Sequence, residues 1–287
     1  MDKEVIMDNK TKKMFEEVQK LLDCSCQSWL FGAGISFESK IPLMFQLTER
    51  VEKLINDKGT DEQKGLFSAI KNQLSTSAHI EYYLSQIGDL IALIDRTNKL
   101  ELEIDSIVFT SEKLFQLYLK IIEFIGDTVR YGYYKSSTGV EEIGTKDDPI
   151  VNIENHRKFA KAITRIRKEK LSKNYYFTTN YDTLLEDALA LEGIECQDGF
   201  LGTSTGFWKP EKAFEQRSER IIDKVFKLHG SVDWYSDERK EVIRCSHGAT
   251  YISGKHNLLI FPQATKYIET QKDPFAYLFA KFRESFE

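Results

Sequence analysis

A glycine-rich turn at the end of a strand-like run constrains the fold of this chain more than any other feature. Residues 27–31 favour a strand, and Gly32-Ala33-Gly34 follows them directly. Glycines in this place let the backbone approach a pyrophosphate, and a following helix offers N–H donors to the anion. The third glycine of the usual dinucleotide fingerprint is absent, and such turns also serve plain chain reversal. Phosphate binding by this turn and by Ser36 is therefore one interpretation; in the other, Ser36 only caps a helix.

Two further polar motifs also follow strand-like runs. Residues 179–182 (Thr-Asn-Tyr-Asp) come after a β-favouring run, and residues 229–231 (His-Gly-Ser) come after another. Ligands of open α/β sheets bind at the carboxyl ends of the strands, where Asn180 and Asp182 would reach sugar hydroxyls. His229 could accept a proton near neutral pH. Taken singly, each motif also has a structural interpretation, as a turn, a helix cap or a histidine that only packs.

Between these motifs the apolar residues recur at helical spacing. The sequence predicts helices around residues 11–22, 47–55, 80–94, 114–129, 159–166 and 275–286. Thr110 and Ser111 are candidate caps for the fourth of these helices. Thr183 and Glu186 fit a capping box for a helix that ends at Gly193. Residues 131–152 read as a loop, and Leu258 to Phe261 as a strand.

Strands and polar motifs thus occupy the two ends of the chain, and helices lie between them. This order predicts an α/β fold, a Rossmann-like parallel sheet with a large helical insertion subdomain. We assign residues 1–45 and 173–287 to the sheet domain and residues 46–172 to the insertion.

Composition narrows the function classes. The net charge is −5, which gives no overall basic field for a phosphate backbone, so we expect no direct binding of nucleic acid. The charged N-terminus and the lack of a ~20-residue apolar run predict a cytoplasmic protein without a membrane span. The four cysteines form no CxxC pair. The cysteines are better interpreted as four scattered thiols than as a metal site formed by Cys24, Cys26, Cys245 and His247, so we expect no metal.

The three motifs together resemble those of the sirtuins. Residues 32–42 resemble the opening cofactor loop of that family, with a GAG-x-S start and an Ile-Pro at matching spacing. The second and third motifs occur in the family's order. Residues 258–267 also resemble a segment of the bacterial sirtuin-like proteins. The resemblance implies that NAD⁺ is the substrate. It implies catalytic roles for Asn180 and His229, and binding roles for Gly32, Ala33, Gly34, Ser36, Thr179, Asp182, Gly230 and Ser231.

The chain departs from the sirtuin deacylases in several places. It lacks the two CxxC pairs of their zinc ribbon, and Leu43-Met44-Phe45 stands where they have Asp-Phe-Arg. These departures resemble the sirtuin-like effectors of bacterial anti-phage defence. That branch implies an NAD⁺ glycohydrolase that yields nicotinamide and ADP-ribose in abortive infection. It also implies a homo-oligomer, with a partner NTPase, an Argonaute-like protein or a fused C-terminal sensor region.

Two alternatives stay open at this point. One is an NAD-dependent protein deacylase, and the other is a non-catalytic module that binds NAD or ADP-ribose and oligomerises. Within the glycohydrolase interpretation, hydrolysis and cyclisation are both open. The resemblance further implies a last strand and helix after residues 275–286, and we expect this chain to lack them.

Overall fold

The computed structural model describes residues 8–22, 24, 26–97, 101–104, 107–169, 173–215, 222–237, 239, 241–246, 256–259 and 272–285. Its centre is a four-stranded parallel sheet in the order β1 (Cys26–Phe31), β6 (Lys173–Thr178), β10 (Asp223–Lys227) and β7 (Cys196–Gln197). The predicted Rossmann-like α/β class is thereby confirmed. Phe31 and Lys227 both pair with Thr178, so three strands end at one level.

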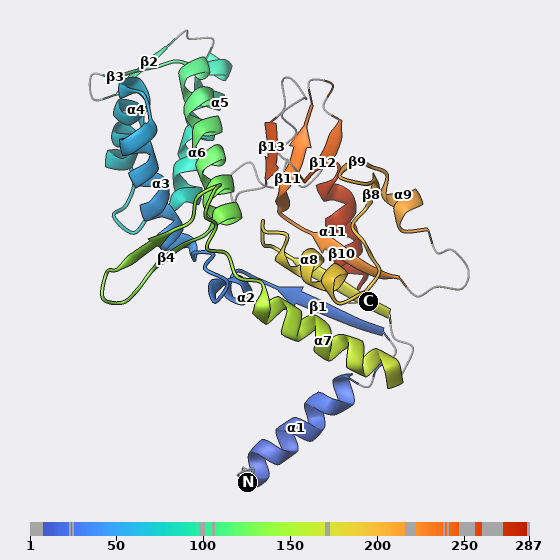
Figure 1. Cartoon of the computed structure of the whole chain (residues 1–287). Helices are drawn as coiled ribbons and strands as arrows, with labels where there is room; N and C mark the ends of the chain where they lie inside the picture. Colours follow the sequence, from blue (N-terminus) through green and yellow to red (C-terminus); the bar gives the residue numbers. More distant parts are fainter. Residues whose placement is uncertain are drawn as a thin grey trace.

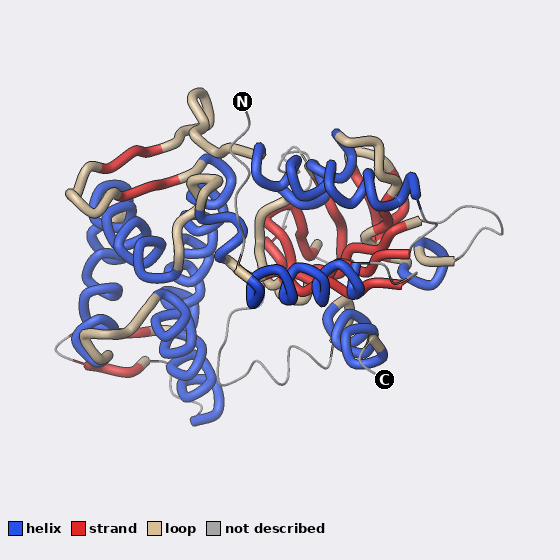
Figure 2. The backbone as a smooth tube through the Cα atoms, turned by 90° about the horizontal axis from the view of Figure 1, so that it is seen from below, coloured by secondary structure: helices blue, strands red, loops and turns tan. Residues whose placement is uncertain are grey.

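Helices cover both faces of this sheet (Figure 2). Side chains alternate along each strand, so Tyr176 and Val225 face α7 (Glu154–Glu169) and α8 (Leu184–Leu191). Phe177 and Phe226 point the other way, into a largely aromatic core that they share with α11 (Phe275–Glu284). Both faces of the sheet are therefore apolar and are covered by helices.

The helices in the middle of the chain form a separate layer beside the sheet (Figure 1). They are α3 (Met44–Lys58), α4 (Asp61–Gln73), α5 (Ile80–Thr97) and α6 (Ser111–Tyr131), and their apolar stripes share one core. The hairpin of β2 (Leu102–Ile104) and β3 (Ile107–Phe109) connects α5 to α6. The predicted cap at Thr110 is confirmed, because its hydroxyl accepts the Lys113 amide at 3.2 Å.

A second sheet of five antiparallel strands contains Gly230 and Ser231 of the third motif. Its order is β13 (His256–Leu259), β11 (Gly230–Ser236), β12 (Val242–Cys245), β9 (Thr205–Trp208) and β8 (Phe200–Gly202), with the short helix α9 (Pro210–Ala213) after β9. The strand expected at residues 258–261 corresponds to β13, and its residues 260–261 lie outside the described residues.

One expectation about the middle of the chain was wrong. Residues 131–152 are not a plain loop, because β4 (Tyr133–Lys135) and β5 (Glu141–Ile143) pair there as a hairpin. The helix α7 packs on the sheet through Ala160 and Ile163 rather than on the helical layer. The division into domains stays a proposal, and this packing favours an insertion that ends before α7 instead of at residue 172.

The helix α1 (Asn9–Leu22) buries none of its residues and extends away from the sheet (Figure 1). The one-turn helix α2 (Gly34–Phe37) follows the glycine turn. Within the described ranges, every helix is too short or too polar to cross a bilayer.

Candidate functional site

Backbone hydrogen bonds tie the three motifs together at the carboxyl edge of the parallel sheet. The Thr179 amide donates to the carbonyl of Phe31 at 3.1 Å, and the Leu228 amide donates to the carbonyl of Thr178 at 2.8 Å. Beyond the ends of these strands, the Val232 amide also donates to the carbonyl of Tyr181 at 2.9 Å. The glycine turn, the Thr-Asn-Tyr-Asp motif and the His-Gly-Ser motif are therefore neighbours in space, as their positions after strands predict.

Three buried side chains from two of these motifs are in direct contact. The Ser36 hydroxyl donates to Asp182 Oδ2 at 2.8 Å and accepts from Asn180 Nδ2 at 3.0 Å. Asn180 is only 9% exposed, and Ser36 only 1%. Ser36 is not the cap of α2, since Ala33 occupies that position. Its hydroxyl instead holds the second motif against the first.

A histidine that the sequence did not single out completes this cluster. His156, at the start of α7, has Nε2 3.5 Å from Ser36 Oγ and Nδ1 3.3 Å from Ser39 Oγ. The single hydroxyl hydrogen of Ser36 is already directed at Asp182, so Nε2 must be the donor and Nδ1 the acceptor. Burial lowers the pKa of His156 against the opposing effect of the Asp182 charge, which favours this neutral form.

One sequence signal could have identified His156. It lies four and seven residues before Ala160 and Ile163, on the stripe of α7 that faces the sheet. A histidine on a buried stripe needs polar partners, and here the serines of the first motif provide them.

The glycine turn is open on its outer side. A Cβ added at Gly32 would meet only Thr179 Oγ1, at 3.9 Å, and one added at Gly34 would meet no described atom within 4 Å. Neither residue has a positive φ, and Gly32, Ala33 and Gly34 are all exposed. The chain's own packing therefore does not require glycine here. Close approach of a ligand such as a pyrophosphate would account for both residues.

Gly230 is a glycine for a different reason. Its φ is +85°, and an added Cβ would collide with the carbonyl oxygen of Leu258 on the neighbouring strand. Its neighbour Ser231 is fully buried, and its hydroxyl donates to the carbonyl of Tyr181 at 3.2 Å. His229 lies between β10 and β11, half-buried, in the turn beside the second motif.

The start of α8 differs from the predicted capping box. The Leu184 amide donates to Asp182 Oδ1 at 3.1 Å, and Thr183 makes no cap hydrogen bond. Glu186 is drawn away because its carboxylate lies 2.9 Å from the ammonium of Lys227 at the end of β10. The capping box was therefore wrong, and Asp182 joins the serine cluster to the first turn of α8.

A polar cavity of about 330 Å³ lies beside Asp182, between α8, the second sheet and the helical layer. Three of its buried polar atoms have no hydrogen-bond partner among the described residues: Glu186 Oε2, Asp233 Oδ1 and Arg244 Nε. Asn180 Oδ1 in the neighbouring cluster is unpartnered in the same sense. Buried polar atoms of this kind call for a bound molecule or water. No group of three acidic, histidine or cysteine side chains in the described ranges is arranged to hold a metal.

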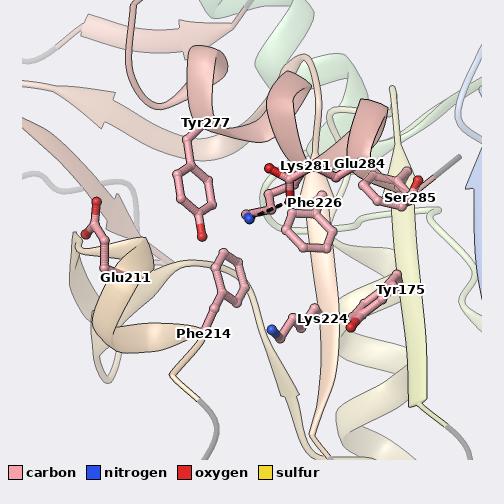
Figure 3. Close-up of a pocket in the computed structure, with 10 residues that line it drawn as sticks. Tyr175, Glu211, Phe214, Lys224, Phe226, Tyr277, Lys281, Glu284 and Ser285 are labelled. Atoms are coloured by element: carbon pink, nitrogen blue, oxygen red, sulfur yellow. Dashed lines mark hydrogen bonds and ion pairs between the residues drawn. The ribbon is translucent and has the colours of Figure 1, made fainter. Parts of the chain in front are cut away.

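A second cavity, of about 380 Å³, lies on the α11 face of the parallel sheet (Figure 3). Phe214, Phe226 and Tyr277 surround it together with Lys224 and Lys281. Lys224 belongs to the first half of β10, whereas the polar motifs follow the strand ends. This aromatic cavity is therefore separate from the cluster around Asn180.

An open parallel sheet, covered by helices on both faces and with polar motifs after its strands, defines a Rossmann-like α/β protein. Residues 174–282 match the family model of the SIR2-like domain. This match supports the sirtuin-like family that the motifs predict. The match covers the second and third motifs, and such a domain is compatible with enzymes that use NAD⁺. No curated protein matches the chain.

Proposed function

We propose that the protein is an NAD⁺ glycohydrolase, which cleaves NAD⁺ to nicotinamide and ADP-ribose. The observation that carries this proposal is the buried contact of Ser36 with Asn180 and Asp182, beside an open glycine turn. The amide of Asn180 is held by its nitrogen, while its buried Oδ1 has no described partner. A buried acceptor without a donor costs ~1–3 kcal/mol. A hydroxyl or water of the bound substrate complex would supply that donor.

Each motif has a distinct role in this proposal. Gly32, Ala33 and Gly34 present backbone donors to the pyrophosphate, and the hydroxyl of Ser36 fixes the two motifs against each other. Asp182 bonds the hydroxyls of the nicotinamide ribose. Each of its oxygens accepts one protein hydrogen bond, so each retains a lone pair for the sugar. Thr179, Gly230 and Ser231 line the same edge of the sheet.

The chemical step exchanges one bond at the anomeric carbon. The bond from that carbon to the nicotinamide nitrogen breaks, and its electron pair neutralises the pyridinium ring. Water oriented by Asn180 then bonds to the oxocarbenium-like carbon, and its proton passes to His229. A positioned general base contributes ~10²–10⁴-fold in rate, and orientation of water and sugar adds to this.

On the resemblance alone, we also propose a role in bacterial anti-phage abortive infection. The helical layer of α3 to α6 is our candidate surface for a homo-oligomer or for a partner NTPase or Argonaute-like protein. A gate of this kind would be needed because an NADase that is always active depletes its own host.

Release of nicotinamide from NAD⁺ by the purified chain tests the proposal. We expect release by the wild type, and a loss of at least ~100-fold in Asn180→Ala and in His229→Ala. Asn155→Ala is the matched control, since Asn155 is an exposed asparagine on α7. Unchanged turnover in Asn180→Ala would refute the assignment. NAD⁺ binding without release in the wild type would favour the non-catalytic alternative, and acyl-lysine cleavage that depends on NAD⁺ would favour the deacylase.

A further inference from the structure

Lys227 is a fully buried lysine directly beside the proposed site. It is the last residue of β10 and is 1% exposed. Its ammonium lies 2.9 Å from Glu186 Oε1 and donates a second hydrogen bond to the backbone carbonyl of Asp182. Burying a charged pair costs several kcal/mol per ion before the attraction is counted, and an apolar pair of the same size is often at least as stable. Stability alone therefore gives little reason for a lysine in this place.

The contacts of Lys227 form a continuous chain to the cluster. Glu186 holds the ammonium, the ammonium holds the Asp182 carbonyl, and the Asp182 carboxylate holds Ser36. Ser36 in turn accepts from Asn180. Because a backbone carbonyl can point in several directions after a strand ends, a donor on it fixes the peptide plane. This carbonyl belongs to the peptide after Asp182, so its direction constrains the backbone of Asp182, and the Asp182 carboxylate then acts on Asn180 through Ser36.

We infer that Lys227 is a positioning residue for the site, and that Glu186 holds its ammonium against the Asp182 carbonyl so that Asn180 and Asp182 keep their orientation toward the ligand. Neither residue is assigned contact with the reacting atoms. The kinetic part of this inference rests on the proposed NAD⁺ glycohydrolase function.

The electrostatics of the pair agree with this role. Burial would lower the pKa of Lys227, but attraction from Glu186, Asp182 and Asp233 outweighs it and raises the pKa, so the ammonium stays charged. Burial raises the pKa of Glu186 to about 7, although Lys227 acts in the opposite direction. Glu186 also reaches the polar cavity, where its Oε2 has no described hydrogen-bond partner. The lysine thus keeps its charge and its two acceptors.

The test uses the double variant Lys227→Met/Glu186→Gln, which removes the ammonium without leaving an unpaired buried carboxylate. We expect kcat for nicotinamide release to fall ~10–100-fold, while KM changes less than about threefold, because misplacement of about 1 Å costs up to ~10²-fold in rate. Lys224→Met is the matched control, since Lys224 lies on the same strand but faces the aromatic cavity. A KM effect without a kcat effect would overturn the inference.

Amide hydrogen exchange gives a readout that needs no activity. The Leu184 amide donates to Asp182 Oδ1, so we expect its exchange to become at least ~10-fold faster in the double variant, with the amides of Val225 and Phe226 unchanged. Unchanged exchange at Leu184 would overturn the inference. This arm stays decisive if the wild type releases no nicotinamide, an outcome that counts against the proposed function alone.

A second variant covers the case in which the double variant does not fold. Glu186→Gln keeps an acceptor for Lys227 but removes the negative charge that holds it. We expect kcat to fall at least ~3-fold and exchange at Leu184 to speed up in parallel, since a charge-assisted hydrogen bond is about twice as strong as a neutral one. Wild-type values for both quantities would overturn the inference.

Discussion

Replacement of Ser36 by alanine removes one oxygen atom that contacts three other buried groups. Asn180 Nδ2 and His156 Nε2 lose an acceptor, and Asp182 Oδ2 loses its hydroxyl donor, while Asp182 Oδ1 keeps the Leu184 amide. An unsatisfied buried polar group costs ~1–3 kcal/mol, and more when it is charged. The Asp182 carboxylate stays partly satisfied, and the contact of His156 is long at 3.5 Å, so we expect a loss of about 2–4 kcal/mol in the free energy of unfolding.

Ser39→Ala is the matched control for this change. Ser39 is as buried as Ser36, and its hydroxyl contacts His156 Nδ1 at 3.3 Å. We expect this variant to lose ~1 kcal/mol, the usual net value of one hydrogen bond. Urea unfolding of the wild type and the two variants at pH 7.5 measures the difference. If Ser36→Ala is no less stable than Ser39→Ala, then Ser36 is not the shared partner that joins the two motifs.

Two further predictions follow from the glycines and from His156. Gly34→Ala should fold normally, because an added Cβ meets no described atom within 4 Å, but it should weaken NAD⁺ binding at least ~10-fold in a calorimetric titration. Gly230→Ala should instead lower the free energy of unfolding by ~1–3 kcal/mol, because residue 230 has a φ of +85°. Equal stability of these two variants would contradict our account of the glycines. The lowered pKa of His156 means that its contribution to stability is complete above its unfolded value of ~6.5 and is lost as pH falls through the folded value. Between pH 7.5 and pH 5, the urea concentration at the unfolding midpoint should therefore fall more for the wild type than for His156→Gln. An equal decrease in both proteins would contradict the buried neutral histidine.

The sequence predicted the elements that depend on local pattern. Apolar stripes located the long helices except α4, which the analysis missed, and β-favouring runs located β1, β6 and β10. Parallel strands that end at one level then bring their following residues together, which is why the predicted binding residues Ser36 and Asp182 are in contact.

Features that depend on tertiary partners escaped the sequence analysis. Glu186 has the spacing of a capping box, but Lys227 on β10 competes for its carboxylate. A hydrogen bond from the charged ammonium is stronger than one from a backbone amide, so the carboxylate binds the lysine. Strands β8, β9 and β12 have only three or four residues, so their alternation is too brief to detect, and the longer β11 is buried on both faces and does not alternate. His156 acquires its importance only when α7 packs on the sheet and places it beside Ser36 and Ser39.

The helical layer is joined to the site through the second motif and strand β11 of the second sheet. Arg130, at the end of α6, donates to the carbonyl of Val232 at 2.6 Å, and the amide of Val232 donates to the carbonyl of Tyr181. Val232 and Leu184 belong to the core of the helical layer, although they lie on β11 and α8. A shift of α6 must therefore break the bond from Arg130 or carry Val232 with it. Because Tyr181 stands between Asn180 and Asp182, a displaced Val232 would move the two residues that the proposed reaction needs most.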